Sequence, residues 1–123
     1  MYIIGDIGNS EVKISIFSSK NKQVKKIVLK TSSINSKNLN KSISSIYKFN
    51  KNSKVLFSSV VPNVYKSVKF FFLKKFKIKT IKLKELKLKK FIQIKKNKKQ
   101  VGSDRLCNAI ALTNKKSNFI IID

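Results

Sequence analysis

The first residues able to do chemistry form a short polar cluster close to the amino terminus. The Asp6 carboxylate can hold a magnesium ion, usually through water, and Gly8 lets the backbone come close to a ligand. Asn9 and Ser10 supply hydrogen-bond donors for phosphate oxygens, and Lys13 can reach a phosphate as a point charge. Taken alone, however, these residues are more simply explained by an ordinary hairpin with Gly-Asn at its tip.

A second cluster, Gly102–Arg105, stands where a helix is predicted to begin, and backbone N–H groups at such a position attract anions. Asp104 is the only acidic residue within 18 positions on either side, and it can accept a proton from a substrate hydroxyl, as kinase aspartates do. Arg105, the single arginine, can make a two-pronged contact with a carboxylate. A helix-capping aspartate beside a surface arginine explains this cluster about equally well.

Other residue types narrow the possible chemistry. The chain has no histidine, which excludes Ser-His-Asp and Cys-His catalysis and histidine zinc sites. The single cysteine, Cys107, cannot form an internal disulfide and fits a reducing compartment. It is most simply a small residue on a helix face. The segment Ser58–Asn63 is interpreted as a strand end followed by a helix start, with no chemical role.

Strands that alternate with helices must position these clusters, and the hydrophobic spacing predicts where they lie. Three strands come first, and the later strands alternate with helices, so we expect an α/β sheet in one domain, residues 1–123. The expected strands are Tyr2–Ile4 continuing to Asp6, a segment with Val12, Ile14 and Ile16 alternating, Val24–Leu29, Lys54–Ser59, one or two short strands within 78–88, and Phe119–Ile122.

Three helices are expected, and each has a candidate capping residue. Ser36, Asn63, and either Ser103 or Asp104 are predicted to cap them, and the third helix is expected to continue to Lys116. The predicted buried stripes are Leu39, Ile43, Ile46 and Tyr47 in the first helix, Val64, Val68, Phe71 and Phe72 in the second, and Leu106, Ala109, Ile110 and Thr113 in the third. The chain stops directly after an apolar strand, so a truncated chain is expected.

The composition bounds the possible partners and location. The 123 residues carry a net charge of +24, which favours contact with anions such as nucleic acid. The lysines are spread along the whole chain, so we expect a solvated lysine coat that binds nucleic acid only non-specifically. No apolar run reaches the roughly 20 residues of a membrane span, and no secretory signal opens the chain, so a cytoplasmic protein without membrane contact is expected.

Taken together, three segments resemble type III pantothenate kinases: Asp6–Ser10, Ser58–Pro62 and Val101–Ala109, in this order and spacing, with an apolar strand that ends at Asp123. The resemblance covers the whole chain but only the amino-terminal half of the family's length. It implies a ribonuclease-H-like α/β domain of the acetate-kinase, sugar-kinase and actin superfamily, truncated before the second domain. It also implies a cytoplasmic homodimer at full length.

The implied activity is ATP-dependent phosphorylation of pantothenate to 4'-phosphopantothenate, the first step of coenzyme A biosynthesis. The implied cofactors are magnesium and a monovalent cation, potassium or ammonium. Two other hypotheses stay open. One is a decayed or truncated relative without catalysis, and the less favoured one is a basic nucleic-acid-binding module. The fragment alone is expected to be inactive.

The resemblance also assigns residues. It implies that ATP phosphates are bound by Asp6, Ile7, Gly8, Asn9, Ser10, Glu11, Val12 and Lys13, with magnesium at Asp6. It implies that pantothenate is bound by Gly102, Ser103, Asp104 and Arg105, with Asp104 as the catalytic base, and that Asp123 holds the monovalent cation. The chain departs from the family pattern at Lys95 and Lys98, where tyrosine and proline are usual, and at Ser103, where alanine is usual.

Overall fold

The fold is built around a mixed five-stranded sheet with the strand order β3-β2-β1-β4-β5. The computed structural model describes residues 1–44, 49, 52–95, 97, 100–113 and 120. The strands are β1 (Tyr2–Ile7), β2 (Glu11–Phe17), β3 (Gln23–Lys30), β4 (Lys54–Ser59) and β5 (Thr80–Lys82). Neighbours are antiparallel from β3 to β1 and parallel from β1 to β5, because hairpins join the first three strands and helical crossovers join the rest.

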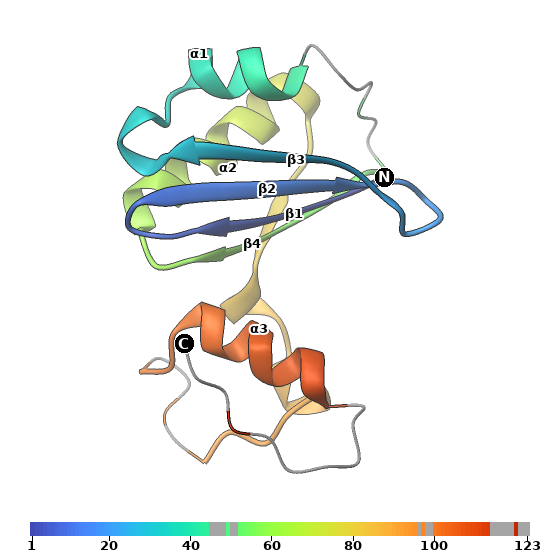
Figure 1. Cartoon of the computed structure of the whole chain (residues 1–123), viewed down its shortest axis with the longest axis vertical. Coiled ribbons are helices and arrows are strands. Elements are labelled where there is room, and N and C mark those ends of the chain that lie inside the picture. Colours follow the sequence, from blue (N-terminus) through green and yellow to red (C-terminus); the bar gives the residue numbers. More distant parts are fainter. Residues whose placement is uncertain (45–48, 50–51, 96, 98–99, 114–119, 121–123) are drawn as a thin grey trace.

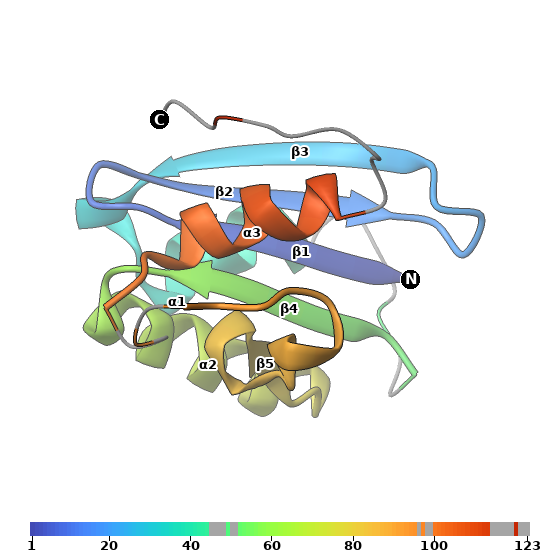
Figure 2. The same cartoon turned by 90° about the horizontal axis from the view of Figure 1, so that it is seen from below.

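Helices cover both faces of the sheet (Figure 1). On one face lie α1 (Ser36–Leu39), which continues into a π-helical turn (Asn40–Ser44), and α2 (Pro62–Phe76). On the opposite face lies α3 (Ser103–Leu112), which Figure 2 shows in front of the sheet. Short 3-10 turns occupy Thr31–Ser33, Leu83–Glu85 and Leu88–Lys90. The predicted α/β class is confirmed, and the topology is consistent with a ribonuclease-H-like domain.

The main core lies between the sheet and the α1–α2 layer. Alternate residues of β1 and β2 point into it, because side chains of a strand project to opposite faces in turn. Phe57 of β4 packs over Gly5 of β1, where an added Cβ would collide with the aromatic ring. The largest completely buried side chains of this core include Ile3, Ile7, Ile14, Ile16, Leu39, Ile43, Phe57 and Phe72.

All three predicted helix caps were wrong. The side chain of Asn35, not Ser36, caps α1 by accepting a hydrogen bond from the Asn38 amide at 2.9 Å. Val61 precedes α2, which begins with Pro62 because the fixed φ of proline suits the first helical position. Gly102 precedes α3, so neither Ser103 nor Asp104 is its cap.

The buried stripes were predicted more accurately than the caps. Leu39 and Ile43 are buried as expected in the first helical segment. In α2, Val68, Phe71 and Phe72 are buried as predicted, but Tyr65 is buried in place of Val64, which is only half-buried. The third helix, α3, ends at Leu112, before the predicted end at Lys116. The predicted stripe residues Ile46 and Tyr47, and also Asp123, lie outside the described residues. So does the strand Phe119–Ile122, except Ile120, which is 92% exposed.

A smaller apolar cluster holds α3 in place. Leu106 of α3 packs with Leu83 and Leu88, which follow β5, and all three are almost fully buried. At the start of α3, the Ser103 hydroxyl donates a hydrogen bond to the Ser59 carbonyl at the end of β4, at 3.4 Å. These two anchors place the first turns of α3 against the carboxyl end of β4.

Lysines lie on several sides of the molecule. Lys25 and Lys26 are on the edge strand β3, Lys66 and Lys69 are on α2, and further lysines follow β5 on the other side of the sheet. Within the part of the chain that the structure describes, no helix has the length and apolar character needed to cross a membrane.

Candidate active site

The register of the sheet puts three polar side chains in one row. Asp6 of β1 is paired with Lys13 of β2 on one side and with Ser58 of β4 on the other. Side chains at paired positions of neighbouring strands lie on the same face, so all three project toward α3. Strand pairing therefore places Ser58 beside Asp6 and Lys13 of the first sequence cluster, although Ser58 is about 50 residues away from them in the chain.

An open cleft of about 400 Å³ lies over this row. The next row of the sheet, Ser15, Ile4 and Leu56, extends its floor. Its other wall is α3, which contributes residues one helical turn apart. The lining residues from the three sequence clusters and the helix wall are Asp6, Lys13, Ser58, Asp104, Cys107 and Asn108.

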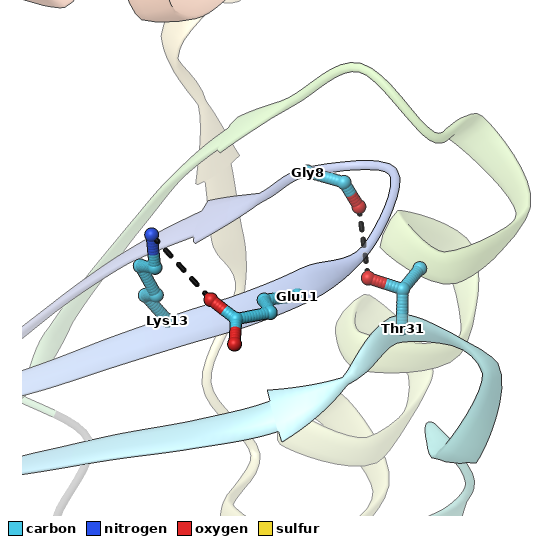
Figure 3. A network of polar contacts seen from close by, with 4 residues as sticks. All are labelled: Gly8, Glu11, Lys13 and Thr31. Carbon is cyan, nitrogen blue, oxygen red and sulfur yellow. Dashed lines mark hydrogen bonds and ion pairs between the residues drawn. The ribbon is translucent and has the colours of Figure 1, made fainter.

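Thr31 fixes the turn that follows Asp6. Its hydroxyl donates a hydrogen bond to the Gly8 carbonyl at 2.8 Å (Figure 3). Its amide donates a hydrogen bond to the Ser10 carbonyl at 2.9 Å. The Gly8 amide donates to the Glu11 carbonyl at 2.9 Å. Thr31 is not among the site residues predicted from the sequence, because nothing in its local sequence shows that the end of β3 meets this turn.

Lys13 is held only weakly. Its ammonium group lies 3.6 Å from the Glu11 carboxylate, and both side chains are about half exposed (Figure 3). A surface ion pair of this kind contributes at most about 1 kcal/mol. The ammonium can therefore leave Glu11 for a more highly charged anion in the cleft.

The residues of the segment Gly102–Arg105 face in different directions. The Asp104 carboxylate lines the cleft and folds back over Gly102, where an added Cβ would collide with it. Ser103 is completely buried beneath the helix start. Arg105 is exposed and lines a separate hollow of about 550 Å³. Successive residues of a helix are rotated by about 100° around its axis, so side chains that are adjacent in sequence point toward different surfaces.

Ser58 is an exception among the buried polar groups. Its side chain is only 5% exposed, and among the described residues its hydroxyl has no hydrogen-bond partner. Leaving a buried hydroxyl unpaired costs about 1–3 kcal/mol. The adjacent Ser59 contrasts with it, since the Ser59 hydroxyl both donates to the Val61 carbonyl and accepts from the Val61 amide, at 3.2 Å each.

The pKa of the Cys107 thiol depends on the charged groups that line the cleft. Partial burial raises its pKa above the ordinary value, and the Asp6 carboxylate raises the pKa further because it repels a thiolate. Proximity to the Ser58 hydroxyl lowers the pKa, although no hydrogen bond of normal geometry joins the two groups. The Asp104 carboxylate adds a smaller rise. Cys107, Asp6, Ser58 and Asp104 thus form one electrostatic neighbourhood.

The cleft unites part of the predicted site. It brings together Asp6, Lys13 and Asp104, whereas Ile7 and Val12 are buried on the other face of the sheet. Asn9, Ser10 and Glu11 are exposed in and beside the turn. Lys95 is exposed and lines the Arg105 hollow, while Lys98 and Asp123 lie outside the described residues.

The donor set suits magnesium only with help from other ligands. In the described parts of the chain, no three carboxylate or thiol side chains gather closely enough to hold a metal ion directly. Asp6 supplies one carboxylate at the centre of the row. Magnesium keeps several waters and is commonly held by one or two carboxylates together with substrate phosphates, so Asp6 fits this role.

Comparison with known proteins adds an independent finding. A family model described as "Type III pantothenate kinase" matches residues 2–123. A protein of Pelagibacter ubique named type III pantothenate kinase is 52% identical over 124 residues. This alignment covers 100% of the present chain and 50% of that protein. The chain therefore spans about half the length of the curated relative it matches.

Proposed function

Because the chain belongs to the type III pantothenate kinase family, we propose that it forms the part of a pantothenate kinase that carries the catalytic base. The reaction would be transfer of the γ-phosphoryl group of ATP to the primary hydroxyl of pantothenate, the first step of coenzyme A biosynthesis. We assign residues 1–123 to its amino-terminal, ribonuclease-H-like domain.

One observation carries this proposal. Asp6 and Lys13 from the first sequence cluster line the same cleft as Asp104 from the second. Phosphoryl transfer needs an acceptor base, charge neutralisation of the phosphates and a metal ligand close together. The cleft offers a carboxylate on α3 for the first task, a lysine on β2 for the second and a carboxylate on β1 for the third.

The roles follow from the position of each group. Asp104 accepts the proton of the attacking hydroxyl, as the base of a kinase does. Lys13 moves from Glu11 to the phosphates and neutralises part of their charge. Asp6 would hold a magnesium ion through water, and such an ion would supply positive charge to neutralise the phosphate oxygens. The exposed amides and hydroxyl of Asn9 and Ser10 donate to phosphate oxygens.

Arg105 would bind the pantothenate carboxylate. Pantothenate carries its primary hydroxyl and its carboxylate at opposite ends, and Asp104 and Arg105 face two different hollows beside the first turn of α3. A substrate that crosses this turn can place its hydroxyl at Asp104 and its carboxylate at Arg105. Gly102 leaves space for the Asp104 carboxylate, and buried Ser103 fixes the turn.

Further properties of the family belong to the same proposal. We assign the monovalent cation, potassium or ammonium, to Asp123, and we expect a cytoplasmic homodimer at the family's full length. The chain spans half of its relative, so residues 1–123 alone are expected to lack activity.

A hybrid protein tests the proposed function. In it, residues 1–123 replace the aligned half of the Pelagibacter ubique relative. We expect the hybrid to release ADP from ATP only when pantothenate, magnesium and a monovalent cation are present. The intact relative is the positive control, and the 123-residue chain is the negative control. A folded hybrid without pantothenate-dependent ADP release would instead support a non-catalytic relative.

A further inference from the structure

Ser58 has no task in the transfer described above, yet it occupies the floor of the cleft. We propose that the Ser58 hydroxyl is a substrate contact that donates a hydrogen bond to the oxygen of the acceptor's primary hydroxyl and holds it beside Asp104. This inference rests on the proposed function and assigns a contact to the middle sequence cluster, Ser58–Pro62, which the sequence alone left without a chemical role.

The first argument is the unpaired hydroxyl itself. Buried polar groups in proteins nearly always have a partner, so an unpaired one marks a place for a water molecule or a ligand. Ser58 is 5% exposed, lines the cleft and has no partner among the described residues. The nearby Cys107 thiol does not satisfy it, because a thiol is a weak donor and a weak acceptor.

The second argument is the order of side chains along the row. Lys13 lies at one end, Asp6 in the middle and Ser58 at the other end. The lysine end is cationic and suits phosphates. The Ser58 end lies on β4, the strand to which the start of α3 is anchored through Ser103 and the Ser59 carbonyl. The strand order therefore puts Ser58 at the end that faces the helix carrying the base.

The third argument is hydrogen-bond complementarity. An ionised carboxylate only accepts hydrogen bonds, whereas a serine hydroxyl can donate one. A ligand hydroxyl between them can donate its proton to Asp104 and accept the hydrogen bond from Ser58. Ser58 then orients the oxygen that attacks the phosphoryl group, while the proton leaves toward Asp104. A phosphate oxygen in the same position would be repelled by the Asp104 carboxylate.

The experiment compares two adjacent serines. Ser58→Ala removes the unpaired hydroxyl, and Ser59→Ala removes a hydroxyl that is paired with Val61. Thermal unfolding is measured on the 123-residue chain, and kinetics are measured on the hybrid protein. We expect Ser58→Ala to lower kcat/KM for pantothenate roughly threefold to tenfold, the loss of one neutral hydrogen bond. The KM for ATP should not change, and the unfolding temperature should not fall, because the hydroxyl that is removed has no partner among the described residues.

The possible outcomes distinguish a failure of the proposed kinase function from a failure of the proposed Ser58 contact. A hybrid without pantothenate kinase activity overturns the proposed function, and the Ser58 inference with it. An active hybrid in which Ser58→Ala has normal kinetics overturns only the inference. A rise in the KM for ATP would place the hydroxyl at the phosphates and also overturn it. An unfolding temperature that falls as far as in Ser59→Ala would show a structural role instead.

Discussion

At the scale of single residues, the cleft depends on which groups its strands and helix bring face to face. Asp6 and Asp104 come from β1 and α3, nearly 100 residues apart in sequence, and both act on the Cys107 thiol. Two predictions belong to this scale.

The first concerns the proposed base. Asp104→Asn keeps the shape of the side chain but cannot accept a proton, so turnover of the hybrid protein should fall roughly 10²–10⁴-fold. Stability should fall by no more than about 1 kcal/mol, because only a favourable interaction with the helix dipole is lost. Steady-state kinetics and thermal unfolding measure the two effects. Turnover close to that of the unmodified hybrid would show that Asp104 is not the base.

The second concerns the pH dependence of Cys107 alkylation by iodoacetamide. The thiolate is the reactive form, and burial and two carboxylates raise the pKa of the thiol. Neutralising a carboxylate stabilises the thiolate, so the midpoint of the rate profile should move to lower pH. Asp6→Asn should move it further than Asp104→Asn, because the Asp6 charge has the larger effect.

Glu11→Gln is the matched control for this pH profile. It also removes a carboxylate, but Glu11 is paired with Lys13 outside the set of groups that act on the thiol. Its midpoint should equal that of the unmodified chain. An equal shift in all three variants would mean that the pKa of Cys107 follows only the net charge of the protein. It would contradict a specific effect of Asp6 and Asp104 on the thiol.

At the scale of elements, short connections fix how helices leave the sheet. The chain passes from β3 through a 3-10 turn to Asn35, whose side chain accepts from the Asn38 amide and donates to the Ser33 carbonyl. The same 3-10 turn contains Thr31, which is hydrogen-bonded to the carbonyls of Gly8 and Ser10. This one turn therefore positions both the start of α1 and the turn between β1 and β2.

A pair of alanine variants tests this capping. Asn35→Ala should destabilise the chain by about 1 kcal/mol, since it loses the cap of α1. The unfolding temperature should then fall by a few degrees. Ser36→Ala should change it little, because Ser36 is the first residue inside the helix, where alanine is well tolerated. A larger loss of stability in Ser36→Ala than in Asn35→Ala would show that Asn35 is not the residue that caps α1.

At the scale of the whole molecule, the net charge of +24 dominates the surface. Lysines lie on the edge strand, on α2 and beyond β5, which occupy different sides of the fold. On β3 they also protect an exposed strand edge against pairing with other chains. This distribution favours a general lysine coat over one face specialised for nucleic acid.

The lysine coat predicts salt-sensitive, non-selective binding to DNA. The chain should bind random duplex DNA at about 50 mM salt and lose affinity on the order of a thousandfold by about 200 mM, as counterion release requires. Fluorescence anisotropy with two unrelated duplexes measures both the slope and the selectivity. Strong preference for one duplex that persists at high salt would contradict a coat and support a nucleic-acid-binding module.

The sequence by itself determined the order of the strands and α-helices that the structure describes, from β1 to α3. The alternation of apolar and polar residues predicted β2, and Lys54–Ser59 was predicted with the bounds of β4. Both strands could be predicted because the residues of a strand alternate between buried and exposed positions along a short stretch of sequence. The short clusters around Asp6 and Asp104 indicated the family that the comparison then showed. These features are local, so composition, spacing and motifs suffice to find them.

Only the tertiary structure decided which distant groups meet. The row of Lys13, Asp6 and Ser58 depends on the register of three strands, and a shift by one residue would turn Ser58 to the other face. The pairing of Thr31 with the turn and the unpaired state of the Ser58 hydroxyl also depend on long-range packing. No local pattern encodes such contacts, because they arise when chain segments far apart in sequence are brought to one edge of the sheet.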